Sequence, residues 1–333
     1  MKKKTLIFDL NNLFFSCFCA NPSVNSNNHH IGGIVGTLQM IQKICMDVKP
    51  HQLFMVWDGA KSSKRRKALN ENYKEGRSAP RPYTLNKHFQ YENEEKEAEN
   101  RRYQQARVVE ILSYCPVVQL IEPGIEADDV ISYLVQNVNK DGINIAVSND
   151  KDYLQLVEKD VVLYRFTTKV YLTKEDVVEK YGILPSNMAL ARAVEGDQSD
   201  NLKGVDRVGM KTIIKYFPEL KKKENILFDE FFQLVEEKNK IKTTVALPNI
   251  LSSRQLIEDN YKIMQLYSPM IDAITTISLE ESIKSKTLGF SLTAFNLQLM
   301  KDGMQYSDFI NLVDHFNRIV NFSKLNNKIP QQW

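Results

Sequence analysis

Three short, largely apolar segments, each ending near an aspartate, constrain this chain most strongly. Residues 5–8, 53–57 and 143–147 have the pattern of strands that are buried on both faces, as in a parallel sheet. Asp9, Asp58 and Asp150 follow them. Ligand sites of open α/β sheets lie at the carboxyl ends of the strands. The sequence therefore predicts an α/β fold with a mostly parallel central sheet and a carboxylate site at one edge.

A helix predicted from Glu126 to about Val138 brings further acids to the same edge. Apolar residues recur at helical spacing between 130 and 135, and Glu126 and Asp129 share a face with Asp128 on its flank. Acids in a first helical turn also complement the helix dipole, and Asp is a common N-cap, so each acid alone has an ordinary structural explanation. The recurrence of acids at three strand ends favours one shared site.

Nine acids are candidate ligands of this site. Carboxylates held this close raise one another's pKa unless cations lie among them, and oxygen ligands suit Mg²⁺ or Mn²⁺. We therefore predict a metal site. The candidates are Asp9, Asp58, Glu126, Asp128, Asp129, Asp150, Asp152, Asp197 and Asp200.

The overall charge hides a division between this cluster and the rest of the chain. The sequence has 44 Lys and Arg against 41 Asp and Glu, so setting the nine candidate acids aside leaves 44 basic against 32 acidic residues. A basic body around an acidic pocket is typical of enzymes that cleave phosphodiesters.

Composition and the start of the chain bear on class and location. The chain has 333 residues, of which 43% are hydrophobic, so it can bury a large core in one or two domains. It has neither an apolar run long enough to span a bilayer nor a signal-peptide pattern, and its four cysteines form no paired CxxC site. We expect free thiols, no membrane association, and a monomer in the cytoplasm of a bacterium or a phage-infected cell.

The segment 61–102, which follows Asp58, is strongly charged and poor in apolar residues. Lys74 and Arg77 are three residues apart, which predicts one face of a helix. A charge run is usually a solvated surface, but the position of this one favours a phosphate-binding arch over the metal site, with Lys64, Arg65 and Arg66 at its start. Phe14 and Phe15 are a common core pair, and one of them beside the pocket would stack on a base.

A Gly-x-x-x-x-Gly pattern from Gly204 to Gly209 lies between two predicted helices within 190–217 and indicates a helix–hairpin–helix. Glycines permit a tight hairpin whose amides, with the next helix N-terminus, bind a phosphate. Arg207, Lys211 and Lys215 flank it and support nucleic-acid binding; an ordinary helical turn is the alternative.

These elements predict three parts of the chain: an α/β nuclease domain at 1–184 with its arch at 61–102, an all-α domain at 185–322, and a disordered tail at 323–333.

Taken together, the motifs resemble the 5′-nuclease (flap endonuclease) family, which includes the 5′-nuclease domain of bacterial DNA polymerase I, and are most similar to its phage RNase H-type branch. The shared motifs are Phe-Asp-Leu-Asn-Asn, Val-Trp-Asp-Gly, Tyr-Lys-Glu-Gly-Arg, Glu-Ala-Asp-Asp, Asn-Asp-Lys-Asp and Gly-Asp-Gln-Ser-Asp-Asn. They occur in the family's order and spacing over roughly residues 4–217.

The resemblance implies a two-metal nuclease that removes RNA primers or 5′ flaps during DNA replication. It implies that the nine acids bind two Mg²⁺, which Mn²⁺ can replace. Lys74 and Arg77 would reach the scissile phosphate, Phe15 would stack on a base, and the hairpin from Gly204 to Gly209 would hold duplex and a K⁺ ion. Expected substrates are DNA and RNA–DNA duplexes with 5′ ends or flaps.

Two other functions stay open at this point: a metal-dependent single-strand ribonuclease on a related fold, and a non-catalytic nucleic-acid-binding protein. The choice between RNA and DNA is also open. So is the replication partner, whether a single-strand-binding protein, a sliding clamp or a polymerase, because no clamp-binding peptide is evident beyond Lys221.

Overall fold

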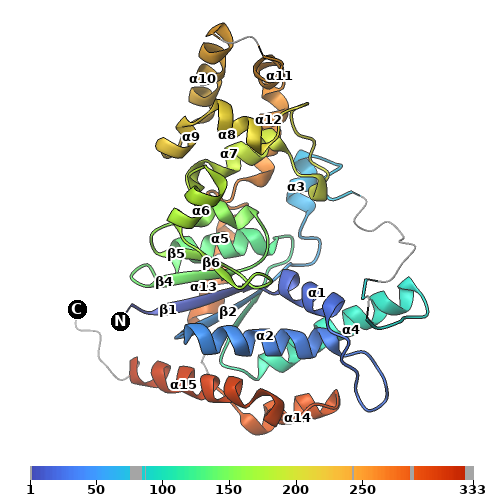
Figure 1. Ribbon diagram of the computed structural model, residues 1–333. Coiled ribbons are helices and arrows are strands. Elements are labelled where there is room, and N and C mark those ends of the chain that lie inside the picture. Colours follow the sequence, from blue (N-terminus) through green and yellow to red (C-terminus); the bar gives the residue numbers. More distant parts are fainter. Residues whose placement is uncertain (1, 76–84, 87, 242–243, 286–288, 327–333) are drawn as a thin grey trace.

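A twisted sheet with helices on both faces forms the centre of the molecule (Figure 1). The computed structural model describes residues 2–75, 85–86, 88–241, 244–285 and 289–326. The strands are β1 (Lys4–Asp9), β2 (Gln52–Trp57), β3 (Val118–Ile121), β4 (Ile143–Val147), β5 (Val161–Arg165) and β6 (Val170–Leu172). Their order is β3-β2-β1-β4-β5-β6, with parallel pairing as far as β5 and β6 antiparallel at the edge. The predicted α/β fold with a mostly parallel sheet is confirmed.

Both faces of the sheet are buried, as the apolar strands predicted. Along β1, Ile7 belongs to one apolar cluster, whereas Leu6 and Phe8 belong to the other. The second cluster lies under α1 (Leu10–Ala20), α2 (Gly32–Val48) and α4 (Glu94–Ser113). The first lies under α5 (Ala127–Asn137), the 3₁₀ helix η1 (Asp152–Leu156) and α13 (Ala273–Ser285). The helix predicted from Glu126 is α5, with Glu126 as its N-cap.

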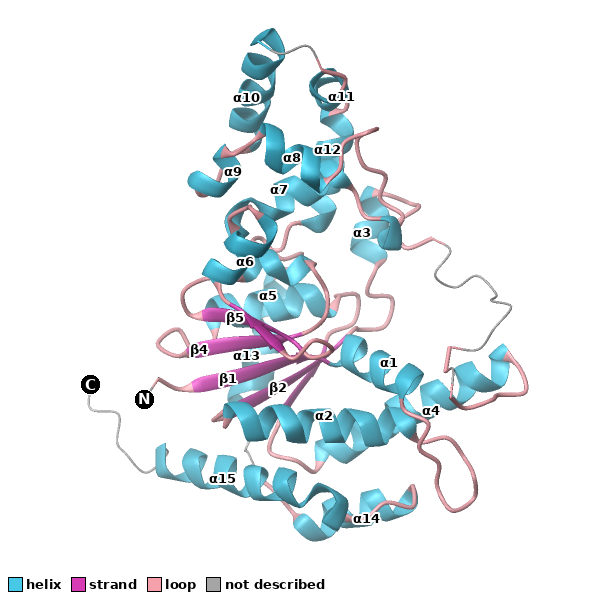
Figure 2. Ribbon diagram, in the orientation of Figure 1, coloured by secondary structure: helices cyan, strands magenta, loops and turns pink. Residues whose placement is uncertain are grey.

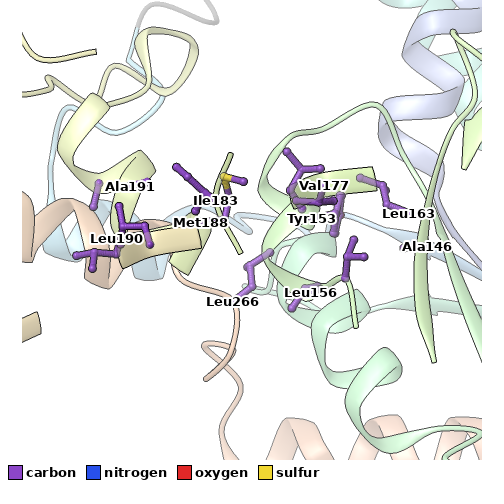
Figure 3. Close-up of a cluster of buried hydrophobic side chains, with 14 of the residues drawn as sticks. Ala146, Tyr153, Leu156, Leu163, Val177, Ile183, Met188, Leu190, Ala191 and Leu266 are labelled. Carbon is purple, nitrogen blue, oxygen red and sulfur yellow. The ribbon is translucent and has the colours of Figure 1, made fainter. Parts of the chain in front are cut away.

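A helical region extends from this body to one end of the molecule (Figure 2). It comprises α6 (Lys174–Tyr181), α7 (Pro185–Glu195), η2 (Gln198–Asp200), α8 (Met210–Tyr216), α9 (Glu219–Lys222), α10 (Phe228–Ile241), α11 (Ala246–Ser252) and α12 (Arg254–Met264). One apolar cluster continues from the sheet through η1 into α7, as Ala146, Tyr153 and Met188 show in Figure 3. The domain boundary at 184 stays a prediction, and the apolar packing is continuous across it.

The last helices pack on the outer side of α2 and α4 instead of joining the helical region (Figure 2). In α14 (Leu292–Lys301), η3 (Tyr306–Phe309) and α15 (Ile310–Asn326), Phe295 and Phe316 join the cluster beneath α2. Arg107 Nε of α4 lies 2.9 Å from Asp302 Oδ2, and both side chains are buried. Residues 292–322, predicted as part of one helical domain over 185–322, bury their apolar faces against α2 and α4, and the division of the chain into domains stays a prediction. Of the predicted tail, 323–326 continues α15 and 327–333 lies outside the described residues.

Within the described ranges, no helix is both long and apolar enough to cross a membrane.

Replacing Asp302 with alanine should destabilise the protein, because it leaves the buried guanidinium of Arg107 without this carboxylate. We expect a loss of roughly 3 kcal/mol in the free energy of unfolding, the low end for breaking a buried pair, since Glu110 still contacts Arg107. Urea unfolding measures it. The control is Lys301→Ala, which removes an exposed partner of Glu110 and should cost under about 1 kcal/mol. Equal losses of unfolding free energy in the two variants would show that the buried pair of Asp302 and Arg107 does not stabilise the protein.

Candidate active site

A cavity of about 540 Å³ opens at the carboxyl edge of the sheet. Its acidic lining comes from the ends of β1, β2 and β4, the first turn of α5, and η2: Asp9, Asp58, Asp150, Asp128 and Asp200. Phe15, Lys74 and Arg101 also line it. The structure thus brings five of the nine predicted acids to one cavity.

Local hydrogen bonds fix the first two of these acids. Asp9 caps α1 by accepting a bond from the backbone N–H of Asn12 at 3.1 Å, and Ser148 Oγ donates to its other oxygen at 2.9 Å. Asp58 Oδ1 accepts from the backbone N–H of Ala127 at 2.8 Å, at the start of α5, and the amide of Asn11 donates to Asp58 Oδ2. Both acids therefore bond to the N-terminus of a helix, as the sequence allowed, and also line the shared cavity.

The cavity holds more negative charge than its surroundings neutralise. Burial raises the pKa of Asp9 to about 8, and the nearby carboxylate of Asp128 adds to the shift. Burial and then Asp128 likewise raise the pKa of Asp150. A bound cation would remove this cost.

Two predicted ligands, Glu126 and Asp129, instead bind a buried arginine. Arg66 Nη1 lies 3.0 Å from Glu126 Oε2 and 2.7 Å from Asp129 Oδ2. Asp129 Oδ1 also accepts from the backbone N–H of Met270 at 2.9 Å, so its carboxylate is committed away from the cavity, contrary to its predicted role. Arg66 is 3% exposed and faces these two acids, so the structure does not bring it to the surface, and its contact with nucleic acid stays a prediction. It lies on α3 (Lys64–Leu69), where its Nε donates to the carbonyl of Ile263.

Asp152 and Asp197 share another arginine, Arg192 of α7, which the sequence analysis did not single out. Arg192 Nη2 lies 2.7 Å from Asp152 and 2.6 Å from Asp197. Burial and Asp150 raise the pKa of Asp152 to about 8. Burial opposes ionisation of Asp197, but bonds from Ser199 and the charge of Arg192 lower its pKa overall. Asp197 lies five residues beyond Arg192 in the sequence, whereas Asp152 meets Arg192 only through the packing of α7 on η1, which no local pattern marks.

Lys74 reaches the cavity from a turn. Its φ of 56° is left-handed, so the predicted helix through Lys74 and Arg77 is wrong at Lys74, and Arg77 lies outside the described residues. The backbone N–H of Lys74 donates to the carbonyl of Asp200, and its Nζ lies 2.9 Å from Glu126 Oε1. Burial opposes its charge, but Glu126 and the neighbouring acids raise the pKa of Lys74 overall.

The other predicted contacts around the arch differ in exposure. Lys64 is exposed, whereas Arg65 donates to the carbonyl of Met270 and pairs with Asp272 at 2.6 Å. Phe15 is 43% exposed, with the guanidinium of Arg101 above its ring at 5.8 Å from the centroid.

The predicted hairpin lies between α7 and α8, and only its first glycine is sterically required. A Cβ on Gly204 would lie 1.8 Å from the carbonyl oxygen of Glu195, whereas one on Gly209 would meet nothing within 4 Å. The close approach therefore belongs to Gly204. Its predicted nucleic-acid-binding neighbours are exposed: Arg207, Lys211 and Lys215.

The donor chemistry of the cavity fits a hard divalent ion. Its acidic lining offers carboxylate oxygens, which Mg²⁺ and Mn²⁺ prefer. Among the described residues, no three Asp, Glu, His or Cys side chains converge closely enough to enclose an ion. The fit therefore rests on the chemistry of the donors and on the raised pKa of the buried acids.

The raised pKa of Asp9 predicts how metal-free stability depends on pH. Asp9 titrates near pH 8 when folded and near 4 when unfolded, so between these values the folded state binds the proton more tightly and stability falls as pH rises. Asp9→Asn removes this dependence. In EDTA it should melt about 3 °C or more above the wild type at pH 8, with a smaller difference at pH 5. The control is Asp160→Asn, at a half-exposed acid outside the cavity that pairs with Lys2. A difference from the wild type that is the same at both pH values would refute the assignment.

Comparison with known proteins gives these features a family. The family described as 5'-3' exonuclease, N-terminal resolvase-like domain, matches residues 4–182. A 5'-3' exonuclease of Aquifex aeolicus is 29% identical over 286 residues, which are 85% of this chain and 87% of that protein. DNA polymerase I of Caldicellulosiruptor bescii is 34% identical over 232 residues, 67% of this chain but only 25% of the polymerase.

Solved structures of low identity share the fold. The bacteriophage T5 flap endonuclease, solved as a pseudo-enzyme–product complex with DNA and metal ions, gives a TM-score of 0.68 at 20% identity over 85% of this chain and 97% of that one. Human GEN1, solved with Holliday junction DNA, gives 0.56 at 16% identity over 94% of this chain and 72% of that one. With the family match over more than half of its length, the chain belongs to the 5'-3' exonuclease family.

Proposed function

We propose that this nuclease hydrolyses phosphodiesters of DNA or RNA–DNA duplexes that carry 5′ ends or flaps, and that it removes primers during replication. The observation that carries the proposal is the cavity at the sheet edge, where five acids from separate elements meet beside Lys74 and Phe15. The similarity to 5'-3' exonucleases and the presence of DNA in the T5 complex support it.

Two Mg²⁺ ions belong to this proposal, with Mn²⁺ as a substitute. The acids that line the cavity would hold them: Asp9, Asp58, Asp128, Asp150 and Asp200. Bound there, divalent ions would supply Lewis acidity toward the phosphate and lower the pKa of an attacking water. The T5 flap endonuclease was solved with metal ions as well as DNA, which supports this part of the proposal.

The chain's own cations would act on the phosphate and the base. Lys74 Nζ, now held by Glu126, lies where it can neutralise charge that develops on phosphoryl oxygens in the cavity. The half-exposed ring of Phe15 would stack on a base at the cavity mouth, and Arg101 would add charge beside it.

The hairpin would grip the duplex away from the cavity. Gly204 lets the chain turn tightly against Glu195, and Arg207, Lys211 and Lys215 are exposed around the start of α8. Phosphates of the nucleic-acid duplex would bind these side chains and nearby backbone amides of the protein, and a K⁺ ion would bind at the turn.

Asp128→Asn tests the catalytic proposal. With Mg²⁺, cleavage of a 5′-labelled flap duplex and of an RNA–DNA hybrid should fall more than about 100-fold, beyond the usual cost of losing a residue that only supports a metal. Duplex binding in EDTA should be unchanged or tighter, because a negative charge is removed. The control is Asp141→Asn, at an exposed acid before β4. Wild-type turnover by Asp128→Asn would reject the metal site.

Lys211→Ala tests the hairpin. Loss of one phosphate contact should weaken duplex binding and reduce the slope of log affinity against log salt by about 1, with little effect on single strands. Lys284→Ala, at an exposed lysine of α13, is the matched control. An unchanged salt slope for Lys211→Ala would place the duplex elsewhere.

A further inference from the structure

Tyr153 places one hydroxyl between two acids of the cavity. Its ring is 1% exposed and belongs to the apolar cluster that joins the sheet to α7 (Figure 3). Its hydroxyl donates a hydrogen bond to Asp128 Oδ1 at 2.7 Å. The same hydroxyl lies 3.3 Å from Asp9 Oδ2. Neither the acidic motifs nor the proposed function assigns a role to this residue.

The two acids depend on this hydroxyl to different degrees. Asp9 has donors close to it in the sequence and on β4, namely the backbone of Asn12 and the hydroxyl of Ser148. Among the described residues, Tyr153 is the only hydrogen-bond donor to the side chain of Asp128. Asp128 is half-buried in the first turn of α5, so without Tyr153 no hydrogen bond from the described residues would hold its carboxylate against repulsion from Asp9.

We propose that Tyr153 is a positioning residue for the divalent metal site: its hydroxyl holds Asp128 Oδ1 at a fixed distance from Asp9 and leaves Asp128 Oδ2 to bind a cation. The inference rests on the proposed function, because it concerns the same site. Hydrogen bonds to a ligating carboxylate orient it and lower the entropy cost of binding the metal.

Tyr153 acts as a hydrogen-bond donor and not as a base. A tyrosine hydroxyl already keeps its proton at neutral pH, and burial followed by the charges of Asp128 and Asp9 raises the pKa of Tyr153 further. The hydroxyl proton of Tyr153 bonds to the carboxylate of Asp128 and lies between it and the carboxylate of Asp9, so it reduces the repulsion between the two acids.

The experiment is a Mn²⁺ titration of the protein without nucleic acid, in which electron paramagnetic resonance reports free Mn²⁺. Tyr153→Phe keeps the buried ring and removes the hydroxyl. It should weaken Mn²⁺ binding about tenfold or more, the usual effect of losing a residue that supports a ligand. High Mn²⁺ should then restore cleavage, while duplex affinity in EDTA stays at the wild-type value.

The matched control is Tyr164→Phe. Tyr164 is 2% exposed on β5, its ring contacts Tyr171, and it belongs to the apolar cluster on the opposite face of the sheet. This variant should bind Mn²⁺ as the wild type does. Melting temperatures of both variants in EDTA verify that they are folded.

The outcomes separate the inference from the proposed function. Wild-type Mn²⁺ affinity in Tyr153→Phe, together with lost binding in Asp128→Asn, overturns the role of Tyr153 and leaves the metal site standing. Equal weakening in Tyr153→Phe and Tyr164→Phe also overturns it, because a general loss of packing would explain both. Failure of the wild type to bind Mn²⁺ would overturn the metal site itself, and the inference with it.

Discussion

Repulsion between carboxylates crowded at the carboxyl edge of the parallel sheet determines how the surrounding structure is arranged. Two buried arginines offset part of this repulsion, and each pairs with two of the nine acids. Arg66 takes Glu126 and Asp129, and Arg192 takes Asp152 and Asp197. The five remaining acids line the cavity, where burial and proximity keep the pKa of Asp9 high. The negative charge that can bind cations is therefore that of the cavity acids, which have no arginine partner among these two.

The bonds of Arg66 also decide how the base of the arch is held. Its guanidinium joins α3 to α5 and to the carbonyl of Ile263 at the end of α12, and Arg65 next to it binds the carbonyl of Met270. Tyr73, 2% exposed, donates to Glu126. The described start of the arch is thus packed into the body of the protein, although its composition is strongly charged and poor in apolar residues. Arg66 and Lys74 of this segment pair with buried acids, whereas Lys64 stays exposed.

The C-terminal helices support the opposite wall of the cavity. Asp302 binds Arg107 and accepts a bond from the hydroxyl of Tyr103 at 2.9 Å, and both partners lie on α4. The same helix carries Arg101 and Gln105 to the cavity. Packing of α14 against α4, together with the bonds of Asp302, therefore helps to fix the helix that places Arg101 above Phe15.

The sequence by itself determined three central strands (β1, β2 and β4), α5 and the meeting of acids at one edge, because apolar periodicity and chain direction are local properties. A parallel sheet converts these local properties into position. It could not determine which acids face the cavity. Asp128 and Asp129 are neighbours in one helical turn, but successive residues project about 100° apart, and Arg66, 63 positions away in sequence from Asp129, takes only the second. The left-handed turn at Lys74 depends on a bond to Asp200, and the role of Tyr153 on two acids from other elements. The sequence placed the last helices in an all-α domain but did not show that they pack against α2 and α4. Contacts between distant segments decided these features, and no local pattern encodes such contacts.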